Sequence, residues 1–476
     1  MTARFTLEQA AWAAGAQGLS GGGLTGSASL EGVSTDSRLA APGALFVALV
    51  GESFDGSLFA AAAARQGCAA VLVPTVAGAR VVEQLRAATL GAAVLAAPDT
   101  TRALGNLARA WRARMAEVRV VAITGSAGKT STKELVASVL AAAGPTLKTE
   151  GNLNNEVGVP QTLLRLSSDH RFAAIECGMN HLGEIARLAS YADADVAIVT
   201  NAAPVHLEGC GSLEGVAHAK GELFHALRGT GIAVANADDP LVLAQAKLSL
   251  HKLITFGRAE GASVRLLAAR HGGAGIEGRL QFPGGEAREF TLSLIGLHNA
   301  LNAAAAAAAG TALGLPIETM IKGLARARTP GRRMRPVHLS RGRLLLDDCY
   351  NANPASTAAA LDTLQEIARG RGRAIAVLGD MLELGPTELD LHREVGRKAG
   401  KSGLSLLIGF GERARALLEG AGLSKEIAVS VLDPAEAASL IDSRTREGDV
   451  ILIKGSRGMK MERISDALSG SSGGSH

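Results

Sequence analysis

Residues 118–132 read VRVVAITGSAGKTST, and the interpretation of the chain starts from them. The apolar run at residues 120–123 predicts a short buried strand, and the apolar spacing of residues 129–140 predicts a helix directly after it. A strand that enters a helix through a Gly-rich turn directs several backbone N–H groups at one point, and the positive end of the helix dipole adds to them. The stretch is therefore typical of a loop that binds a phosphate chain.

The turn itself has the residue types of an ATP-binding loop, in a shortened form. Lys129 can neutralise the β- and γ-phosphates, and the Thr130 hydroxyl can ligate Mg²⁺. The usual pattern has a Gly where this chain has Ile123, so the standard spacing fails by one residue. A tight strand–helix turn with an exposed lysine is the structural alternative. We expect the phosphate loop to consist of Gly125, Ser126, Ala127, Gly128, Lys129, Thr130 and Ser131.

The composition describes an ordered, soluble protein of several domains. With 476 residues the chain exceeds one hydrophobic core, so about two to four domains are expected. A net charge of +4 without a Lys/Arg block, together with 3% aromatic residues, argues against nucleic-acid binding. The four cysteines are far apart, which fits a reducing compartment and argues against structural zinc. Neither a signal peptide nor a long apolar span is visible, so we expect a cytoplasmic protein without membrane insertion.

The order of apolar and polar runs predicts an α/β protein of three units. Residues 1–115 should form a small α/β unit, with residues 1–16 as an amphipathic helix. Residues 116–329 should form a P-loop ATPase-like unit around a mostly parallel sheet. Residues 330–476 alternate strands with helices, which predicts a Rossmann-like, doubly wound sheet. A Thr-Pro-Gly turn at residues 329–331 reads as the linker before this last unit.

Polar residues follow several expected strands of the central unit. Glu176 follows the strand at residues 172–175, and Asn201 follows the strand at residues 196–199. In an open α/β sheet, ligands bind beyond the carboxyl ends of the strands, so these residues and Gly125 should lie together. Any one of the three could be a capping residue, but the combination favours a binding site.

Two further polar stretches suit parts of a nucleotide. Asn299 and Asn302 are three residues apart on a predicted helix and share a face, which suits an adenine edge, although one of them could simply be an N-cap. Near the N-terminus, clustered hydroxyls, a carboxylate and an arginine suit a uracil, a ribose and a diphosphate, with a surface turn as the alternative. These residues are Ser34, Thr35, Asp36, Ser37 and Arg38.

Nine stretches, in order, resemble the MurF ligases of the Mur ligase family, which are UDP-N-acetylmuramoyl-tripeptide–D-alanyl-D-alanine ligases of bacterial cell-wall synthesis. They read TGSAGKTSTK, EGNLNNEVGVP, IECGMNHLGEI, HLEGCGSLEGVAHAKGELF, GLHNALNAAAA, PGRR, LLLDDCYNANP, VLGDMLELG and IKGSRGMKME. The stretches STDSR, LFVAL and FDG resemble the UDP-binding domain that these ligases share with MurE. The family usually shows a histidine soon after FDG, where this chain has Ser57 and Leu58, so we expect nothing of that position.

The resemblance implies an ATP-dependent ligase that joins D-alanyl-D-alanine to UDP-MurNAc-tripeptide through an acyl phosphate, with the first unit holding the UDP end. It also implies two Mg²⁺ ions and a carbamate, derived from CO₂, on Lys220; a monomer is expected. Folylpolyglutamate synthase carries its phosphate loop nearer the N-terminus, and MurE carries an Asp-Asn-Pro-Arg motif that this chain lacks. A non-catalytic nucleotide switch would not need a second metal site.

The resemblance assigns residues to these roles. Lys129 would bind the ATP phosphates and Thr130 the first Mg²⁺. Glu176 would be a metal ligand, His206 would bind the second metal, and carbamylated Lys220 would be a further Mg²⁺ ligand. Without the match, Lys220 would be read as a solvated helix lysine. The loops at residues 351–354 and 380–385 would shape the pocket for the dipeptide. The implied nucleotide-side residues are Asn299, Asn302, Arg332 and Asp348, and the implied substrate-side residues, beyond the first unit, are Asn154, Asn155, Asn351, Lys454 and Arg457.

Overall fold

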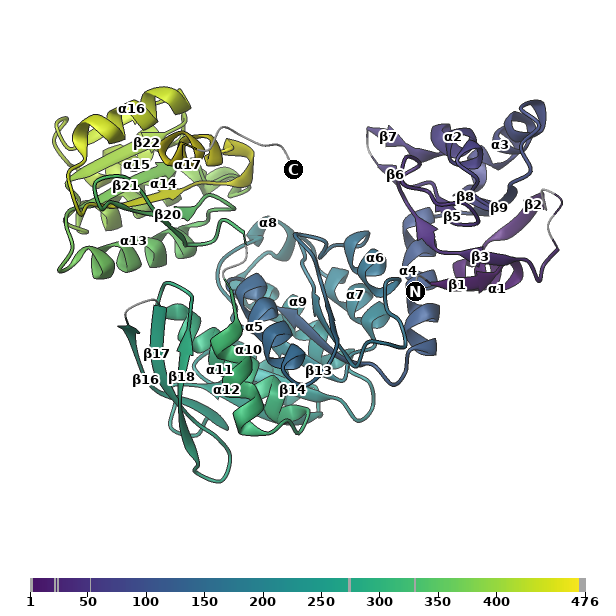
Figure 1. Ribbon diagram of the computed structural model, residues 1–476, viewed down its shortest axis with the longest axis horizontal. Coiled ribbons are helices and arrows are strands. Elements are labelled where there is room, and N and C mark those ends of the chain that lie inside the picture. The colour runs from purple at the N-terminus through teal and green to yellow at the C-terminus, as the bar shows by residue number, and fades with distance from the viewer. Residues whose placement is uncertain are drawn as a thin grey trace.

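The computed structural model describes residues 3–20, 23, 25–51, 53–272, 275–328 and 331–470, which fold around three open sheets. Figure 1 shows these sheets in three lobes, with the N-terminal lobe in purple, the central lobe in blue to green and the C-terminal lobe in green to yellow. Thr329 and Pro330 of the expected linker lie outside the described residues. Within the described part of the chain, no helix combines the length and apolar character needed to cross a membrane.

The N-terminal lobe is built on a five-stranded sheet of order β2-β9-β8-β5-β4. Its central strands are buried on both faces, as expected where helices cover a parallel sheet. The strands are β2 (Gln17–Ser20), β4 (Val33–Ser34), β5 (Leu45–Val47), β8 (Ala70–Pro74) and β9 (Ala93–Ala97), besides the pairs β1 (Arg4–Thr6) with β3 (Ser29–Glu31) and β6 (Val50–Gly51) with β7 (Phe54–Asp55). The helices are α1 (Leu7–Ala14), η1 (Gly56–Phe59), α2 (Ala60–Arg65), α3 (Thr75–Ala87) and α4 (Thr100–Arg114).

The expected helix over residues 1–16 is wrong in its first part. Arg4–Thr6 is strand β1, and the helix begins only at Leu7. Thr6 fixes this start, because its hydroxyl accepts the N–H of Gln9 at 3.2 Å while the Gln9 side chain accepts the N–H of Thr6 at 3.0 Å. This reciprocal capping box satisfies the first N–H groups of the helix and excludes a longer one.

The central lobe carries a nine-stranded sheet of order β11-β12-β10-β13-β14-β15-β16-β17-β18, in which all pairs up to β16 are parallel. The predicted mostly parallel sheet is thus confirmed, and the last two pairs form an antiparallel extension. The strands are β10 (Arg119–Thr124), β11 (Thr146–Lys148), β12 (Phe172–Glu176), β13 (Val196–Val199), β14 (Ile232–Asn236), β15 (Lys252–Gly257), β16 (Val264–Gly272), β17 (Gly275–Gln281) and β18 (Ala287–Leu292).

Helices cover both faces of this sheet. On one face α11 consists largely of alanine, and residues 303–309 are fully buried. Alanine favours the helix and adds little width, so this helix can lie close to the strands and to α5. The helices are α5 (Lys129–Ala141), α6 (Gly158–Leu163), α7 (Glu184–Ala192), α8 (Leu207–Cys210), α9 (Leu213–His225), α10 (Pro240–Leu248), α11 (His298–Ala312) and α12 (Ile317–Arg326).

The C-terminal lobe is a doubly wound sheet of order β19-β20-β24-β21-β22-β23, as predicted. Only the edge pair with β19 is antiparallel, and a separate hydrophobic core lies on each face. The strands are β19 (Arg335–His338), β20 (Leu344–Asp348), β21 (Ala374–Gly379), β22 (Leu406–Phe410), β23 (Ala428–Val431) and β24 (Val450–Lys454). The helices are α13 (Pro354–Ala368), η2 (Gly385–Thr387), α14 (Glu388–Gly400), α15 (Ala414–Ala421), α16 (Pro434–Arg444), η3 (Arg457–Met459) and α17 (Glu462–Ser469).

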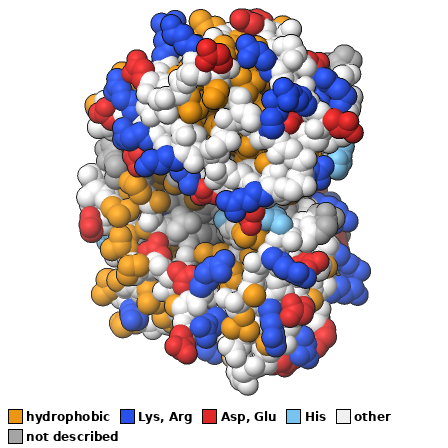
Figure 2. All heavy atoms as spheres, turned by 90° about the vertical axis from the view of Figure 1, so that its left-hand side faces the viewer, with side chains coloured by type: hydrophobic (Ala, Val, Ile, Leu, Met, Phe, Trp, Pro, Cys, Tyr) orange, Lys and Arg blue, Asp and Glu red, His pale blue; other side chains and the backbone are white. Residues whose placement is uncertain are grey.

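The central and C-terminal lobes meet at a narrow contact. His271 of β16 lies 3.2 Å from the Glu366 carboxylate of α13, measured from Nε2 to Oε2. Ile295, just before α11, packs against the core of the C-terminal lobe. In the space-filling view of Figure 2 the molecule is hollowed at the waist between the C-terminal lobe above and the central lobe below.

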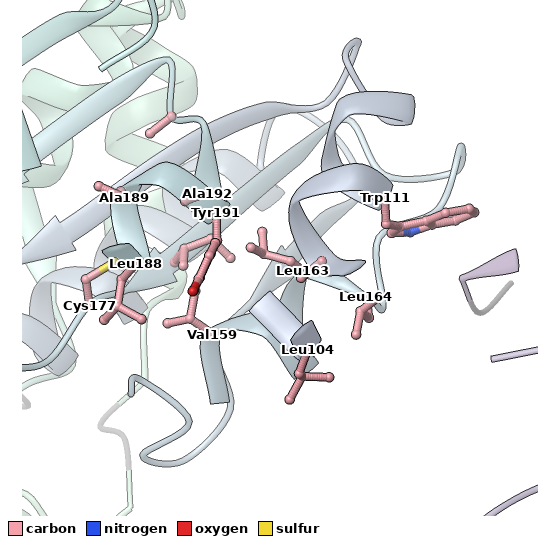
Figure 3. Packing of buried hydrophobic residues seen from close by; sticks show 14 of the residues in the cluster. Leu104, Trp111, Val159, Leu163, Leu164, Cys177, Leu188, Ala189, Tyr191 and Ala192 are labelled. Carbon is pink, nitrogen blue, oxygen red and sulfur yellow. The ribbon is translucent and has the colours of Figure 1, made fainter. Parts of the chain in front are cut away.

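The N-terminal and central lobes share a continuous hydrophobic core. Figure 3 shows residues of α4 facing residues of α6 and α7 across this seam. The Trp111 indole N–H donates to the Leu166 carbonyl at 2.9 Å, which ties α4 to the segment after α6. A Cβ at Gly105 would lie 2.2 Å from the Tyr191 ring, so the helices approach each other at a point where only glycine fits. The N-terminal and central lobes are therefore closely packed against each other where α4 meets α6 and α7.

Candidate functional site

The phosphate loop crosses the carboxyl end of β10 and enters α5 at Lys129. Gly125 has a φ of 151° and Gly128 a φ of 79°, values that glycine adopts readily and other residues rarely do. A Cβ at Gly125 would lie 1.9 Å from the Thr200 hydroxyl oxygen, and one at Gly128 would lie 2.8 Å from the Asn302 side-chain oxygen. Both glycines are therefore required by backbone conformation and by space.

Asn201, just beyond β13, holds this loop in place. Its side-chain oxygen accepts the N–H of Ala127 at 2.8 Å, and its side-chain amide donates to the Ala127 carbonyl at 3.1 Å. Its backbone carbonyl accepts the N–H of Ser126 at 3.0 Å. The structure thus brings Asn201 to the loop, as the position of the strand ends predicts. Ser131 lies in the first turn of α5.

Lys129 is folded back over the loop. Its Nζ donates to the Gly125 carbonyl at 2.6 Å and lies 3.4 Å from the Ser126 carbonyl. Desolvation lowers the pKa of Lys129; the nearby Glu176 opposes that shift, whereas Arg333 adds to it. Among the residues that the structure describes, neutral carbonyls alone hold the ammonium group, so phosphate oxygens can replace them without breaking an ion pair there.

Glu176, at the end of β12, faces the start of α5 and is 2% exposed. Its Oε1 accepts the Thr130 hydroxyl at 3.1 Å and the Asn154 side-chain amide at 2.8 Å. Its Oε2 is buried and has no hydrogen-bond partner among the described residues. A buried carboxylate oxygen beside a hydroxyl is a donor set that suits Mg²⁺, so these residues fit the implied metal.

No three His, Cys, Asp or Glu side chains gather as a metal cluster in the described residues. Mg²⁺ usually keeps several waters and binds one or two protein oxygens together with substrate phosphates, so Thr130 and Glu176 suffice for it.

His206 and Lys220 lie close enough to Lys129 for its charge to act on both. His206 adopts a left-handed backbone, with a φ of 55°. Desolvation and the charges of Lys220 and Lys129 lower its pKa to about 4, so His206 is a neutral imidazole that can accept a metal. Lys220, in α9, is 1% exposed, and burial lowers its pKa well below the ordinary value, an effect that Lys129 increases. Lys220 makes no ion pair with a described residue. The solvated-lysine alternative is wrong.

Asn299 and Asn302 brace the loop from the start of α11. The Asn302 side-chain amide donates to the Asn299 side-chain oxygen at 3.0 Å, and the Asn299 amide donates to the Ile295 carbonyl at 2.8 Å. Neither is the N-cap, which is Leu297. The Asn302 oxygen is the atom against which Gly128 packs.

The predicted C-terminal residues lie where β20 and β24 end. Lys454 Nζ donates to Asp348 Oδ2 at 2.6 Å and to the Asn351 carbonyl at 2.9 Å, so the structure brings these three together. Arg457 lies apart from them, 65% exposed, and contacts Glu462 at 3.3 Å. In the loop at residues 380–385, one of the two expected to shape the dipeptide pocket, Asp380 is buried and accepts the Ala414 N–H at 2.8 Å.

Arg332 does not face the phosphate loop here. Its two terminal nitrogens contact Asp347 at 2.9 Å and Asp466 at 2.7 Å, within the C-terminal lobe. The neighbouring Arg333, which sequence reasoning missed, lies over the Tyr350 ring at 4.0 Å and is close enough to affect the pKa of Lys129. Arg333 makes no ion pair among the described residues. The pair of adjacent arginines at residues 332–333 is the sequence signal that could have pointed to Arg333 as a candidate.

The N-terminal substrate residues form a turn held by its own side chains. Arg38 contacts both Asp36 carboxylate oxygens, at 2.9 and 2.6 Å, and hydrogen bonds from Arg38 lower the pKa of Asp36 to about 2. The Ser34 hydroxyl donates to the Asp36 carbonyl at 2.9 Å. Thr35 accepts the Gln161 side-chain amide at 2.6 Å, which ties the turn to the central lobe. Ser37 is half-buried beside them.

Asn155 has a local structural role in this arrangement. Its side-chain oxygen accepts the N–H groups of Val157 and Gly158 at 3.2 and 2.9 Å, at the start of α6. Asn154, the adjacent residue, instead points to Glu176.

Comparison with known proteins agrees with this geometry. Three family models match: the Mur ligase family catalytic domain at residues 29–112, the Mur ligase middle domain at residues 123–310, and the Mur ligase glutamate ligase domain at residues 332–457. The UDP-N-acetylmuramoyl-tripeptide–D-alanyl-D-alanine ligase of Escherichia coli K12 is 39% identical over 446 residues, covering 92% of this chain and 94% of that protein. The chain belongs to the Mur ligase family, in its MurF branch.

Solved structures lead to the same branch. A crystal structure of MurF from Acinetobacter baumannii superposes with a TM-score of 0.87 at 32% identity, covering 98% of this chain and 99% of that one. MurF ligase from Thermotoga maritima in complex with ADP gives a TM-score of 0.79 at 27% identity, covering 92% and 97%. The chain is therefore an ATP-dependent ligase of peptidoglycan synthesis.

Proposed function

We propose that this chain joins D-alanyl-D-alanine to UDP-N-acetylmuramoyl-tripeptide, with ATP as the source of activation, to give the pentapeptide precursor of peptidoglycan. One observation carries the residue-level proposal. Thr130 and Glu176 meet directly beside Lys129, and one oxygen of that buried carboxylate is unpaired among the described residues. The E. coli and A. baumannii relatives support the choice of substrates.

The reaction needs activation because a carboxylate does not accept an amine at neutral pH. The γ-phosphoryl group is transferred to the tripeptide carboxylate, and the resulting acyl phosphate has phosphate as its leaving group. The dipeptide amine then attacks the acyl carbon, the C–N bond forms and the C–O bond to phosphate breaks. In such transfers the protein mainly positions the groups and neutralises charge.

Lys129 and the start of α5 carry the first of these tasks. The Lys129 ammonium exchanges the Gly125 and Ser126 carbonyls for phosphate oxygens. The first N–H groups of α5 have no intrahelical partner and point to the same place. Thr130 and Glu176 would hold Mg²⁺, which neutralises phosphate charge when bound.

Lys220 would supply the second metal position together with His206. Burial lowers the pKa of Lys220 well below its ordinary value, which favours the neutral amine, and a neutral amine can add to CO₂. The nitrogen lone pair forms the C–N bond, one proton leaves, and the product is a carbamate with two carboxylate-like oxygens. This modification is part of the proposal and explains why a lysine lies buried without a described carboxylate partner.

Arg333 is the cation that we assign to the phosphate side of the C-terminal lobe, in place of Arg332. Arg332 is committed to Asp347 and Asp466. Met334, the next residue, has a left-handed φ of 53°, and its N–H donates to Asp348 at 3.1 Å. Arg333 is therefore fixed between two anchored neighbours, and an arginine near a γ-phosphate stabilises transition-state charge.

Entry of the acceptor between the lobes follows from the hollowed waist. The Asn351–Lys454–Asp348 group lies at the carboxyl ends of β20 and β24, where Lys454 is paired with Asp348 and donates to the Asn351 carbonyl. We propose that the loops at residues 351–354 and 380–385 bind the dipeptide there, and that the turn at residues 34–38 binds the UDP end. A cytoplasmic location and a monomeric state complete the proposal; all four cysteines are buried and unpaired, which fits a reducing compartment.

A coupled assay of ADP release tests the proposal. Release should require both UDP-MurNAc-tripeptide and D-alanyl-D-alanine, with either meso-diaminopimelate or lysine as the third residue. Free D-alanine, L-lysine and glutamate should be poor acceptors. A single amino acid used as efficiently as the dipeptide would overturn the assignment.

A further inference from the structure

A polar hollow of about 280 Å³ opens at the amino ends of the strands of the C-terminal sheet, the ends that lie away from the ligase site. Its walls are the residues just before β21 and β22 and the connection from α16 to β24. Asp348 and Lys454 of the ligase site lie at the opposite ends of the sheet's strands, at the carboxyl ends of β20 and β24. Strands of five residues at about 3.3 Å each separate the two edges by roughly 17 Å. The hollow is thus separate from the ATP site.

The residue types around the hollow are those of an anion site. Six of its eight lining residues are the arginines Arg373, Arg444 and Arg446 and the hydroxyl residues Ser405, Ser443 and Thr445, and the other two, Ile375 and Leu406, are apolar. No acidic residue is among its lining residues. A lining of guanidinium groups and hydroxyls without a carboxylate is complementary to phosphate oxygens.

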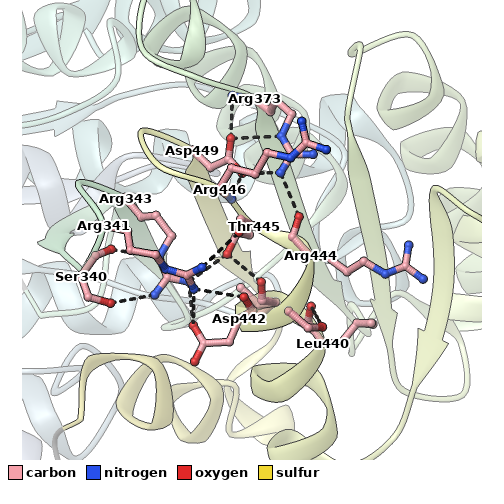
Figure 4. Close-up of polar contacts among 12 residues, drawn as sticks. Ser340, Arg341, Arg343, Arg373, Leu440, Asp442, Arg444, Thr445, Arg446 and Asp449 are labelled. Carbon is pink, nitrogen blue, oxygen red and sulfur yellow. Dashed lines mark hydrogen bonds and ion pairs between the residues drawn. The ribbon is translucent and has the colours of Figure 1, made fainter.

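The floor of the hollow is fixed by Asp449, whose side chain is 2% exposed. Asp449 accepts Nε and Nη2 of Arg373 at 3.2 and 2.7 Å, and the N–H groups of Arg373 and Arg446 at 3.0 and 2.7 Å. Arg373 also donates to the Arg444 carbonyl at 2.8 Å. Figure 4 shows these bonds converging on Asp449, so the backbone that carries the three arginines is held in one arrangement.

Two of the three guanidinium groups remain unneutralised. Arg373 is paired with Asp449, whereas Arg444 and Arg446 form no ion pair with any described residue. Arg444 donates only to the Glu426 carbonyl, at 3.2 Å, and both side chains are exposed. Nearby, Arg343 satisfies Asp442 at 2.6 Å, so that carboxylate is not left for them. Within the described part of the chain, the rim therefore carries two arginines without an acidic partner, over a floor that Asp449 holds.

We propose that this hollow binds a small phosphorylated anion through Arg444 and Arg446. The volume is at the lower limit for small-molecule sites, which favours a diphosphate, or a phosphate on a small organic group, over a large ligand. The forked geometry of arginine binds two phosphate oxygens at once. A phosphate on a lipid head group offers the same chemistry, and the experiment distinguishes the two sources.

Calorimetric titration of pyrophosphate into the full-length enzyme tests the proposal. The phosphate loop contributes equally to every variant, so a difference between variants isolates the hollow. The double variant Arg444→Ser/Arg446→Ser should lose one binding event or weaken it at least tenfold, with unchanged ligase turnover. The matched control is Arg397→Ser/Arg415→Ser, which removes two exposed arginines of α14 and α15 that form no ion pair with a described residue. It should stay within about twofold of the wild type.

Unchanged pyrophosphate binding in the hollow variant, or an equal loss in the control, would overturn the proposal. If the double variant does not fold, the single variants Arg444→Gln and Arg446→Gln should each weaken pyrophosphate binding at least threefold. Unchanged binding in both single variants would also overturn the proposal. Sedimentation with phosphatidylglycerol vesicles identifies the source. Vesicle binding that the double variant loses assigns the phosphate to a lipid, and pyrophosphate binding without vesicle binding assigns it to a free anion.

Discussion

Replacing Asp449 by asparagine should loosen one edge of the C-terminal sheet while keeping the shape of the side chain. Asparagine keeps one acceptor oxygen but loses the one that accepts Arg373 Nη2 and the Arg446 N–H, both at 2.7 Å. A lost charge-assisted bond costs about 1.5–3 kcal/mol and an orphaned buried N–H about 1–3 kcal/mol. Arg373 is 32% exposed, so water reduces the cost. We expect a loss of about 3 kcal/mol, near the lower limit for breaking a buried pair.

Hydrogen exchange measures this loss in one lobe of a multidomain chain. Because about 1.4 kcal/mol corresponds to a factor of ten, the amides of β21 and β24 should exchange about two orders of magnitude faster. Strand β10 of the central lobe serves as the internal reference. Asp390→Asn is the control: Asp390 also contacts an arginine, Arg393 at 3.0 Å, but the two side chains are 80% and 39% exposed, so less than about 1 kcal/mol is expected. An acceleration below tenfold, or an equal one in the control, would refute the reasoning.

The pH dependence checks the same bond. Burial raises the pKa of Asp449, but the bonds from Arg373 and Arg446 outweigh it and hold the pKa below its usual value. Such a carboxyl stabilises the fold above its unfolded pKa of about 3.9, and the stabilisation is lost as the pH falls through the folded value. The difference between the wild type and Asp449→Asn should stay constant from about pH 8 to about pH 5 and shrink below about pH 4.

Three predictions concern the ligase site. Lys129→Ala should fold normally and lower kcat by at least about a hundredfold in the ADP-release assay, and near-normal turnover would contradict the phosphate-loop assignment. Lys220→Ala should lose most activity, and added formate or acetate should restore part of it by occupying the vacated position; a plain ammonium at Lys220 in an active, nucleotide-bound enzyme would count against the carbamate. Arg333→Ala should lower kcat more than it raises KM for ATP, whereas the conservative Arg332→Lys, which loses contacts with Asp347 and Asp466, should mainly lower Tm. The reverse pattern would return the phosphate role to Arg332.

The sequence predicts those parts of the site that are set by local chain geometry. The strand, the glycine turn and the helix at residues 118–132 place Lys129 and Thr130, and the ends of parallel strands place Glu176 and Asn201. Such features follow from the order of residues along the chain. The doubly wound C-terminal sheet is predictable for the same reason, since its alternating strands and helices are local patterns.

Contacts with residues distant in the sequence decide which polar side chains are free to bind a ligand, and the local sequence pattern does not reveal these contacts. The sequence offers Arg332 and Arg333 as equals, but Asp466 of α17 lies 134 residues away and takes Arg332, which leaves Arg333 toward Tyr350. In the same way, Asn155 is a plausible ligand in sequence, yet two adjacent N–H groups use its oxygen at the start of α6. Competition between neighbouring polar groups for a partner is a tertiary property.

The charge balance of the ligase site gives a reason for the buried lysine. The charges of Glu176 and Arg333 act on the pKa of Lys129, and the charge of Lys129 lowers the pKa values of His206 and Lys220. Three full cations there would attract the ATP phosphates but repel a second Mg²⁺. The lowered pKa of Lys220 favours a neutral amine, which would remove one of these charges, and carbamylation would then replace it with a negative one beside His206. A site that must bind both a polyanion and divalent cations needs such a group, whereas a permanent aspartate at residue 220 would neutralise Lys129 when no metal is bound.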